Sequence, residues 1–379
     1  MSAAGGEPEH GGACSSCLRR SWLLSQLSAP LDYQFRTLER LTELLALSDE
    51  HLLRALGGRR RTELTVGYAH FEVQNLPTTK GAQTVCRHRS SYPRSLRDAG
   101  SPPMLNVEGG VSRLAELTAA PTVAIVGSSR ASDYGVEMAK SLARGLAASG
   151  VTVAGGLCDG IEVAAHAGAL EVNGATVAVL PGGLDAGPPA KRRSLYERVR
   201  YRGCGVAELP RGSEARRWGL VASQRILVRL AQLVVVVEAR EHPGDLAGAR
   251  IARALGRPLA AIPGRVTSPA SSGTNALLLN GAHLVRGPAD ALELLFGPEA
   301  QLATARAGPL PELDAALQTT LERVGEGRDT PEKLTREGGD CGEILLALSE
   351  LELMGMLARG DGGRYVPRHA CLHDPTHSA

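Results

Sequence analysis

The stretch that decides the fold reads Thr122-Val123-Ala124-Ile125-Val126-Gly127-Ser128-Ser129-Arg130-Ala131-Ser132-Asp133. Its aliphatic first half is typical of a strand buried on both faces, and its second half predicts a turn of small residues with a helix that opens near Asp133. Such a turn lets the backbone approach a phosphate, and the helix N-terminus offers free N–H groups to it. Arg130 adds a cation suited to a charge-assisted contact. The first candidate phosphate-binding residues are therefore Gly127, Ser128, Ser129 and Arg130.

The same alternation of strand and helix repeats along residues 111–297. Near-continuous aliphatic strands that alternate with helices indicate a parallel sheet covered on both faces. The expected fold class is α/β, with an extended Rossmann-like, doubly wound and mostly parallel sheet. Helices are expected over stretches such as Val136–Ala148 and Leu246–Leu255. The expected strands are Thr122–Gly127, Val151–Gly156, Thr176–Leu180, Val206–Leu209, Leu233–Glu238, Leu259–Ile262 and His283–Val285.

A second glycine turn follows the second strand, and it reads Gly155-Gly156-Leu157-Cys158-Asp159-Gly160-Ile161-Glu162. Ligands of doubly wound sheets collect at the carboxyl ends of the strands, so this turn and the first one are expected to share one cleft. Gly156 and Gly160 join the candidate phosphate-binding residues on this ground. His166 follows one turn into an Ala-rich helix, where a packed or hydrogen-bonding histidine is expected rather than a catalytic one.

The flanking regions predict two further domains. Residues 18–110 predict a small helical domain, of the SAM or helix-hairpin-helix kind, with an extended lead-in, because leucines recur at three- and four-residue spacing between Leu38 and Leu56. Residues 311–368 predict three helices and a hairpin, which suggests a winged helix. The remaining segments are expected to be a disordered tail over 1–17, a linker over 298–310 and a second tail over 369–379.

Charge is unevenly distributed along the 379 residues. Residues 121–297 hold 20 Lys and Arg against 14 Asp and Glu, whereas residues 311–368 hold 7 against 12. A polyanion would therefore prefer the middle domain and be repelled by the last one. Aromatic residues make up only 3% of the chain, which limits base stacking.

The seven cysteines are odd in number and scattered, which is typical of reduced thiols in a cytoplasmic protein. Cys14-x-x-Cys17 has the spacing of half a zinc site, but no second Cys or His pair follows at zinc-finger spacing, so no metal site is expected. The longest aliphatic run, Leu233–Val237, is far shorter than a membrane span, so no membrane association is expected.

Many short motifs of the middle domain resemble the DNA-processing family DprA/Smf, over about residues 85–297. They occur in the order and at the spacing of that family. The matches are Tyr92-Pro93-Arg94-Ser95-Leu96, Pro102-Pro103-Met104-Leu105, Val123–Ser128, Ala131-Ser132, Tyr134-Gly135, Gly156-Leu157, Gly160-Ile161, Ala164-Ala165-His166, Gly168-Ala169-Leu170, Val177–Leu180, Gly183-Leu184-Asp185, Trp218, Val234–Ala239, Ile262-Pro263-Gly264, Gly273, Asn275 and Gly281-Ala282.

This resemblance implies a cytoplasmic protein that binds single-stranded DNA and loads the RecA recombinase onto incoming DNA during natural transformation. It implies a homodimer without enzymatic activity or cofactor. It also adds Gly264, Gly273 and Asn275 to the expected DNA-binding residues.

The chain departs from the family in four short stretches, and three arginines expected near the strand ends are missing. The family usually has Gly-Ser-Arg at the first turn, Ala-Arg where Cys158-Asp159 stand, Phe-Pro-x-Arg-Asn-Arg where Leu220–Arg225 stand, and Asn-Arg where Asn275-Ala276 stand. Arg130 and Arg225 are expected to compensate in part, and Tyr134 and Trp218 are the aromatic candidates near the cleft. Because each lost phosphate contact lowers the salt slope by about one unit, weak binding that fails early with salt is expected.

Two other functions remain open at the level of sequence. Leu180-Pro181-Gly182-Gly183 resembles the loop of Rossmann enzymes that cleave nucleoside monophosphates, although the continuation of that loop differs. Alternatively, the chain is a degenerate family member that acts through protein contacts, since the third helix of the acidic last domain carries Glu343, Glu350 and Glu352 but no Lys or Arg.

Overall fold

The computed structural model divides into two compact units, Met1–Pro298 and Glu299–Ala379. The predicted linker, the last tail and residues 1–11 of the first tail lie outside the residues that the structure describes. Those residues are 12–34, 38–72, 81–98, 100–186, 190–297, 313–326, 328–336, 340–354, 356–359 and 364–367.

The first unit is built on one nine-stranded sheet with the order β1-β2-β6-β5-β4-β3-β7-β8-β9. The strands from β6 to β9 are parallel, and β1 and β2 run antiparallel at one edge. This confirms the expected α/β class and the mostly parallel, doubly wound sheet. The strands are β1 (Ala82–Cys86), β2 (Met104–Glu108), β3 (Thr122–Val126), β4 (Thr152–Gly155), β5 (Thr176–Leu180), β6 (Cys204–Ala207), β7 (Leu233–Val236), β8 (Leu259–Ala261) and β9 (His283–Leu284).

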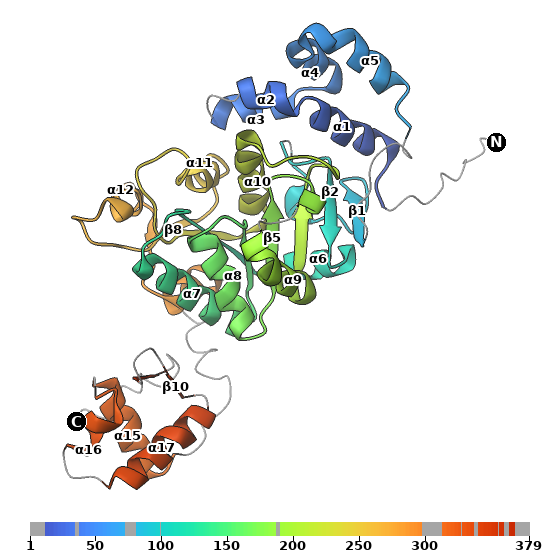
Figure 1. The fold of residues 1–379 in the computed structure, drawn as a ribbon. Coiled ribbons are helices and arrows are strands. Elements are labelled where there is room, and N and C mark those ends of the chain that lie inside the picture. Colours follow the sequence, from blue (N-terminus) through green and yellow to red (C-terminus); the bar gives the residue numbers. More distant parts are fainter. Residues whose placement is uncertain are drawn as a thin grey trace. The chain divides into compact units, whose positions relative to one another are not determined.

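Helices cover both faces of the sheet (Figure 1). Every residue of β3, β4, β5, β6, β7 and β8 is buried, because side chains alternate between two apolar clusters on opposite faces. One face carries α7 (Asp133–Ala148), α8 (Ile161–Glu171), α9 (Arg193–Arg202) and α13 (Pro288–Phe296). The other carries α6 (Val111–Ala119), α10 (Arg217–Leu230), α11 (Ala247–Ala254) and α12 (Ser272–Leu279).

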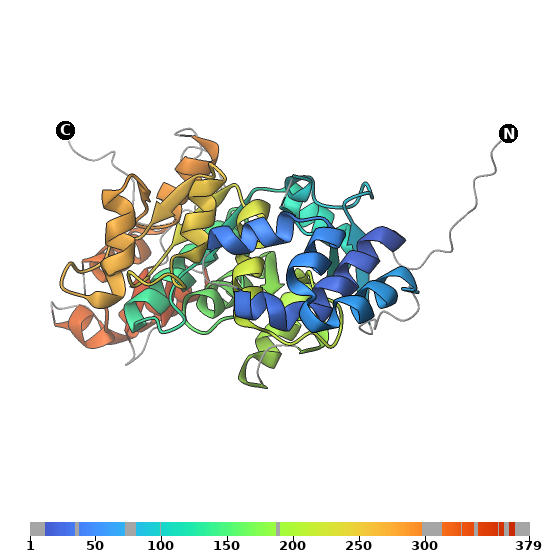
Figure 2. The ribbon, with the colours of Figure 1, turned by 90° about the horizontal axis from the view of Figure 1, so that it is seen from above.

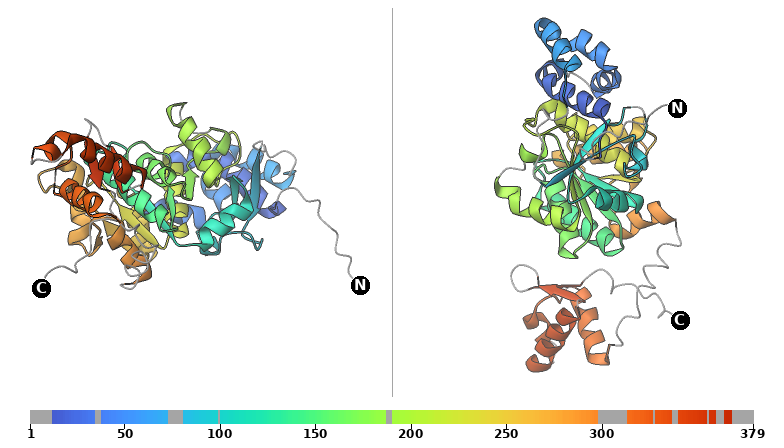
Figure 3. Two further views of the ribbon diagram at one scale, coloured as in Figure 1. Left: turned by 90° about the horizontal axis from the view of Figure 1, so that it is seen from below. Right: turned by 90° about the vertical axis from the view of Figure 1, so that its right-hand side faces the viewer.

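Five short α-helices among the described residues precede the sheet and form the blue group in Figures 2 and 3, and α2 and α3 contact α10. Their leucines form one cluster with Leu209 and Trp218. Trp218 is fully buried there and its indole N–H donates to Ser28 Oγ at 3.0 Å. The expectation that Trp218 is available to stack on a base is therefore wrong. The helices are α1 (Ser15–Gln26), α2 (Ser28–Gln34), α3 (Leu38–Ala46), α4 (Asp49–Leu56) and α5 (Arg61–Ala69).

One expectation for the N-terminal part is wrong. Residues 12–17 are not a disordered tail, because α1 begins at Ser15 and the segment before it packs against the edge strand β1. Cys86 and His88, which do not follow at zinc-finger spacing, lie against the Cys14–Cys17 pair. The strands β1 and β2 were missed as well, in a region whose prolines predicted only an extended lead-in.

The described residues of the second unit form three helices followed by two antiparallel strands, in the order expected from the sequence. Leu348, Leu351 and Leu357 are central to its own apolar core. The assignment of this unit as a winged helix stays a prediction. No helix among the described residues of either unit has the length and apolarity to cross a membrane. The elements are α15 (Ala315–Gly325), α16 (Pro331–Thr335), α17 (Cys341–Leu353), β10 (Leu357–Arg359) and β11 (Tyr365–Pro367).

Candidate nucleic-acid interface

The carboxyl ends of four adjacent strands, β4, β3, β7 and β8, form the candidate interface. The chain reverses its direction of winding between β3 and β7, which is the point where doubly wound sheets bind ligands. The loop after β3 joins both neighbours, because Ser128 N–H donates to the Glu238 carbonyl at 2.7 Å and the Ser128 carbonyl accepts from Ile161 N at 3.3 Å. The first and second glycine turns therefore lie side by side, as the sequence suggested.

Two glycines make this close approach possible. Gly160 has a φ of +76° and a Cβ there would clash with the carbonyl of Ser128. A Cβ at Gly127 would lie 2.6 Å from the Glu238 carbonyl oxygen. Side chains at these positions would force the loops apart, so both glycines shape the interface through the backbone.

The N-terminus of α7 already holds an anionic group of the chain itself. Glu238, buried at the end of β7, accepts hydrogen bonds from Ser132 N and Ser132 Oγ, both at 2.7 Å. A Cβ on Gly135 would lie 2.5 Å from Glu238 Oε2, so the carboxylate covers the first turn of the helix. The Glu238 carboxylate thus lies where the sequence predicted a bound phosphate.

The N-terminal loop of α8 is filled in the same way by Glu162. Its Oε2 accepts from Cys158 N at 3.1 Å and its Oε1 accepts from Gln224 Nε2 at 3.0 Å. Burial raises the pKa of Glu162, while these hydrogen bonds oppose that shift. A carboxylate of the chain therefore occupies both the N-terminus of α7 and the loop that leads into α8.

The buried His166 is hydrogen-bonded to the second glycine turn. Its Nε2 lies 2.8 Å from the Gly156 carbonyl and its Nδ1 lies 2.6 Å from Thr176 Oγ1. Burial lowers the pKa of His166 to about 4, so the ring is neutral, and its Nε2 N–H donates to the Gly156 carbonyl. The expectation of a hydrogen-bonding histidine is confirmed.

Gly264, Gly273 and Asn275 meet beyond the ends of β7 and β8. The Asn275 side chain hydrogen-bonds both backbone polar groups of Gly264: its Oδ1 accepts from Gly264 N at 3.2 Å and its Nδ2 donates to Gly264 O at 3.1 Å. Gly273 N donates to the Ala239 carbonyl at 2.9 Å. These three residues shape the loops of the interface.

Arg225 does not lie with the other candidate residues. Its side chain on α10 is 4% exposed and pairs with Glu208 at 2.5 Å, and it also donates to the Gly100 carbonyl. Together with Arg20 and Arg87 it lines a cavity of about 390 Å³ between the N-terminal helices and the sheet. The structure therefore does not offer Arg225 to a phosphate.

Three exposed arginines are available instead. Arg130 follows β3, Arg240 follows β7 and Arg265 follows β8, so they stand in neighbouring loops. Among the described residues, none of the three guanidinium groups has a hydrogen bond or ion pair. Sequence reasoning missed Arg240 and Arg265, although each comes within four residues of the end of a buried strand.

Tyr134 and Asp159 complete this edge. The Tyr134 hydroxyl donates to the Pro263 carbonyl at 3.0 Å, which ties the start of α7 to the loop of Arg265, and its ring is 49% exposed. Asp159, the anion at the position where the resemblance implies an arginine, pairs with Lys191 at 2.7 Å and with Arg192 at 3.4 Å. The Lys191 hydrogen bond lowers the pKa of Asp159, and the two cations offset its charge.

Comparison with known proteins covers most of the first unit. The family model of DNA recombination-mediator protein A matches residues 83–296. A putative DNA processing protein DprA of Mycobacterium tuberculosis is 37% identical over 271 residues, which is 70% of this chain and 69% of that protein. Protein Smf of Escherichia coli is 33% identical over 287 residues, or 74% and 75% of the two chains.

Two solved structures share the fold. The X-ray structure of DNA processing protein A from Streptococcus pneumoniae superposes with a TM-score of 0.58 at 26% identity, covering 74% of this chain and 96% of that one. A structure of the same protein from Helicobacter pylori, which concerns its single-stranded DNA binding mode, gives a TM-score of 0.50 at 25% identity and covers 56% and 95%.

Proposed function

This chain belongs to the DprA/Smf family of DNA recombination mediators, and we propose that it binds single-stranded DNA along the carboxyl ends of β4, β3, β7 and β8. In this role it acts in the cytoplasm on incoming DNA during natural transformation. The relative from Helicobacter pylori supports the proposal, because the single-stranded DNA binding mode is described for that protein.

The observation that carries the proposal is the row of exposed arginines without internal partners among the described residues. Arg130, Arg240 and Arg265 stand on three adjacent strand ends, with Lys191 beside the fourth. A guanidinium group binds a phosphate through two parallel hydrogen bonds, and a row of them follows a phosphate backbone. Because Glu238 occupies the N-terminus of α7 and Glu162 occupies the loop before α8, we assign the affinity to these arginines rather than to the helix ends.

Base contacts in this proposal come from Tyr134. Its ring is half exposed and its hydroxyl is tied to the Pro263 carbonyl, so the ring is held in place for stacking. Stacking on an aromatic ring is worth about 1–3 kcal/mol per base and tolerates any sequence. Binding should therefore be sensitive to salt and weakly dependent on sequence.

We propose further that the site is not catalytic. Glu162 is held by an amide and by Gln224, and His166 is neutral and bonded on both nitrogens. Burial raises the pKa of Cys158 to about 12, which keeps the thiol protonated and poorly nucleophilic. Incubation with AMP tests this, since release of free adenine would support the rival nucleotide-cleaving function.

The second unit is proposed to contact a protein partner, with RecA as the family's implied candidate. Helix α17 exposes Glu343 and Glu350 together with the apolar side chains of Leu345 and Leu346. An acidic and partly apolar helix repels DNA and suits a protein surface. Pull-down of RecA with the full chain, and with a chain lacking residues 311–379, separates the two roles.

A homodimer is proposed through the β9 edge of the sheet. Leu284 in β9 is 53% exposed, Leu279 at the end of α12 is 89% exposed, and β9 has an unpaired edge among the described strands. Exposed apolar side chains at and shortly before an open edge strand favour association with a second copy. Light scattering should show a dimer for the wild type and a monomer for Leu279→Glu.

A gel shift with oligo-dT at low salt tests the proposed function. Wild type should bind, and a variant with Arg130, Arg240 and Arg265 changed to Ala should not. Arg113→Ala is the matched control, because Arg113 is exposed and donates to the Tyr201 carbonyl, just before β6 begins, toward the opposite edge of the sheet. Absence of a shift by the wild type would disprove DNA binding.

A further inference from the structure

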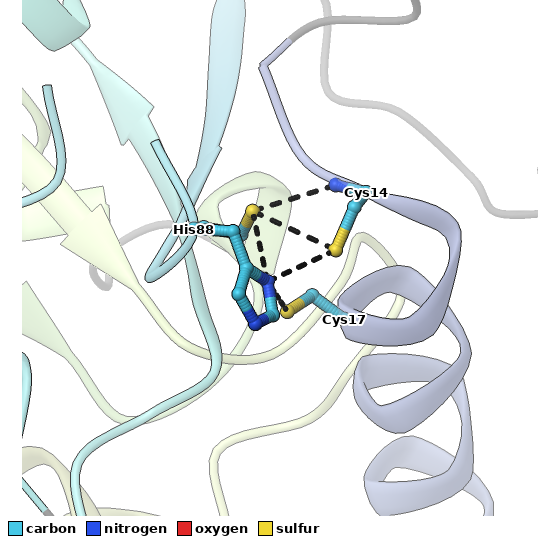
Figure 4. A group of neighbouring side chains, drawn as sticks. Cys14, Cys17 and His88 are labelled. Atoms are coloured by element: carbon cyan, nitrogen blue, oxygen red, sulfur yellow. Dashed lines mark hydrogen bonds between the residues drawn. The ribbon is translucent and has the colours of Figure 1, made fainter. Parts of the chain in front are cut away.

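Four side chains of types that can bind a metal, from two short pairs, meet at the edge of the sheet, as Figure 4 shows. Cys14 is the N-cap residue of α1, without a side-chain capping bond, and Cys17 lies in the first turn of that helix. Cys86 ends β1, and His88 stands in the turn that follows. We propose that Cys14, Cys17, Cys86 and His88 bind one Zn²⁺ ion as a structural site.

The distances among the four donor atoms are those of a tetrahedral centre. His88 Nδ1 lies 3.2 Å from Cys14 Sγ, 3.5 Å from Cys17 Sγ and 3.9 Å from Cys86 Sγ. Cys14 Sγ and Cys86 Sγ are 3.8 Å apart. Zn–S bonds of about 2.3 Å and Zn–N bonds of about 2.0 Å at tetrahedral angles give S···S of about 3.8 Å and S···N of about 3.5 Å.

Neither a disulfide nor hydrogen bonding alone accounts for the cluster. A disulfide needs an S–S distance of about 2.05 Å, whereas all three cysteines are free thiols and the Cys14 and Cys86 sulfurs lie 3.8 Å apart. A ring nitrogen has one proton or one lone pair in the ring plane, so Nδ1 of His88 cannot serve three sulfurs. A single cation at the centre satisfies all four donor atoms together.

The surroundings suit thiolate ligands. Cys14 N–H donates to Cys86 Sγ at 3.4 Å, and the Ser16 hydroxyl lies 3.2 Å from Cys14 Sγ. Cys17 and Cys86 are buried, while His88 is exposed and closes the solvent side. Four protein ligands leave no open position for a substrate, which is the arrangement of a structural zinc site. Soft sulfur ligands together with an imidazole favour zinc over Mg²⁺ or Ca²⁺.

The proposed ion would fasten the N-terminal helices to the sheet. His88 and Cys17 are 71 residues apart in sequence, and all of α2, α3, α4 and α5 lies between them. The same corner also holds a small apolar cluster around Leu18 and Met104. The site would therefore fix the first helix against β1, the edge strand.

Metal analysis of the purified full chain tests the proposal without any DNA. After expression with zinc and dialysis against metal-free buffer, we expect one zinc per chain by mass spectrometry. The X-ray absorption spectrum should show three sulfurs at about 2.3 Å and one nitrogen at about 2.0 Å. A chain that holds no zinc and takes up none from one added equivalent would overturn the proposal.

Variants identify the ligands. His88→Gln changes an exposed residue, so it should fold as judged by circular dichroism, and its zinc affinity in chelator competition should fall about 100-fold or more. Cys341→Ser is the matched control, because Cys341 is an exposed cysteine of the second unit and should leave the affinity unchanged. Wild-type affinity in both His88→Gln and Cys17→Ser would also overturn the proposal.

Discussion

The change Arg130→Ala gives a quantitative test of the proposed interface. Binding to a single strand has a salt slope of about 0.7 for each phosphate that is neutralised. Arg130, Arg240 and Arg265 together therefore predict a slope of about 2, and the loss of Arg130 should reduce it to about 1.4. Between 50 and 200 mM salt, affinity should fall about 20-fold in the wild type but only about 7-fold in the variant.

Fluorescence anisotropy of labelled oligo-dT at several salt concentrations measures both slopes. Arg113→Ala, toward the opposite edge of the sheet, should keep the wild-type slope. An unchanged slope in Arg130→Ala, or an equal reduction in Arg113→Ala, would refute the assignment of the phosphate contacts to the ends of β3, β7 and β8.

Three further outcomes concern stability. Arg225→Ala should lower the free energy of unfolding in urea by about 3–5 kcal/mol, because it leaves the buried Glu208 carboxylate unpaired, whereas Arg54→Ala removes an exposed pair and should cost under about 1 kcal/mol. Burial lowers the pKa of His166 to about 4, so this histidine is protonated in the unfolded chain at a higher pH than in the native state. The free energy of unfolding should therefore fall by about 2 kcal/mol between pH 7 and pH 5, and in His166→Gln it should fall by less. Gly160→Ala should cost about 1–3 kcal/mol and weaken DNA binding, because φ is +76° and the new Cβ meets the carbonyl of the neighbouring turn; equal stability of variant and wild type would contradict this.

The buried parallel strands were predictable because their pattern is local. Thr122–Val126 and Leu233–Val236 are almost wholly aliphatic, which only a sheet covered on both faces requires. The antiparallel β1 and β2 were not predictable in this way. Polar and apolar residues are mixed in these strands at the sheet edge. The prolines between them predict an extended segment rather than the pairing of Val85 with Leu105.

The positions of the site's acids were not predictable from sequence. Glu238 was visible only as the end of a strand, yet its carboxylate meets Ser132, which is 106 residues away in the chain. The pairing of Arg225 with Glu208 likewise depends on tertiary packing. Arg240 and Arg265 could have been found, because the first residues after a buried parallel strand always reach the carboxyl edge of the sheet.

Hydrogen–deuterium exchange of the full chain with and without oligo-dT tests the proposed DNA site most directly. We expect protection in the loops that follow β4, β3, β7 and β8, over residues 156–160, 127–132, 239–245 and 263–268, with no change at α6 toward the opposite edge. Protection confined to the second unit or to α1–α5, with these four loops unchanged, would contradict the proposed site.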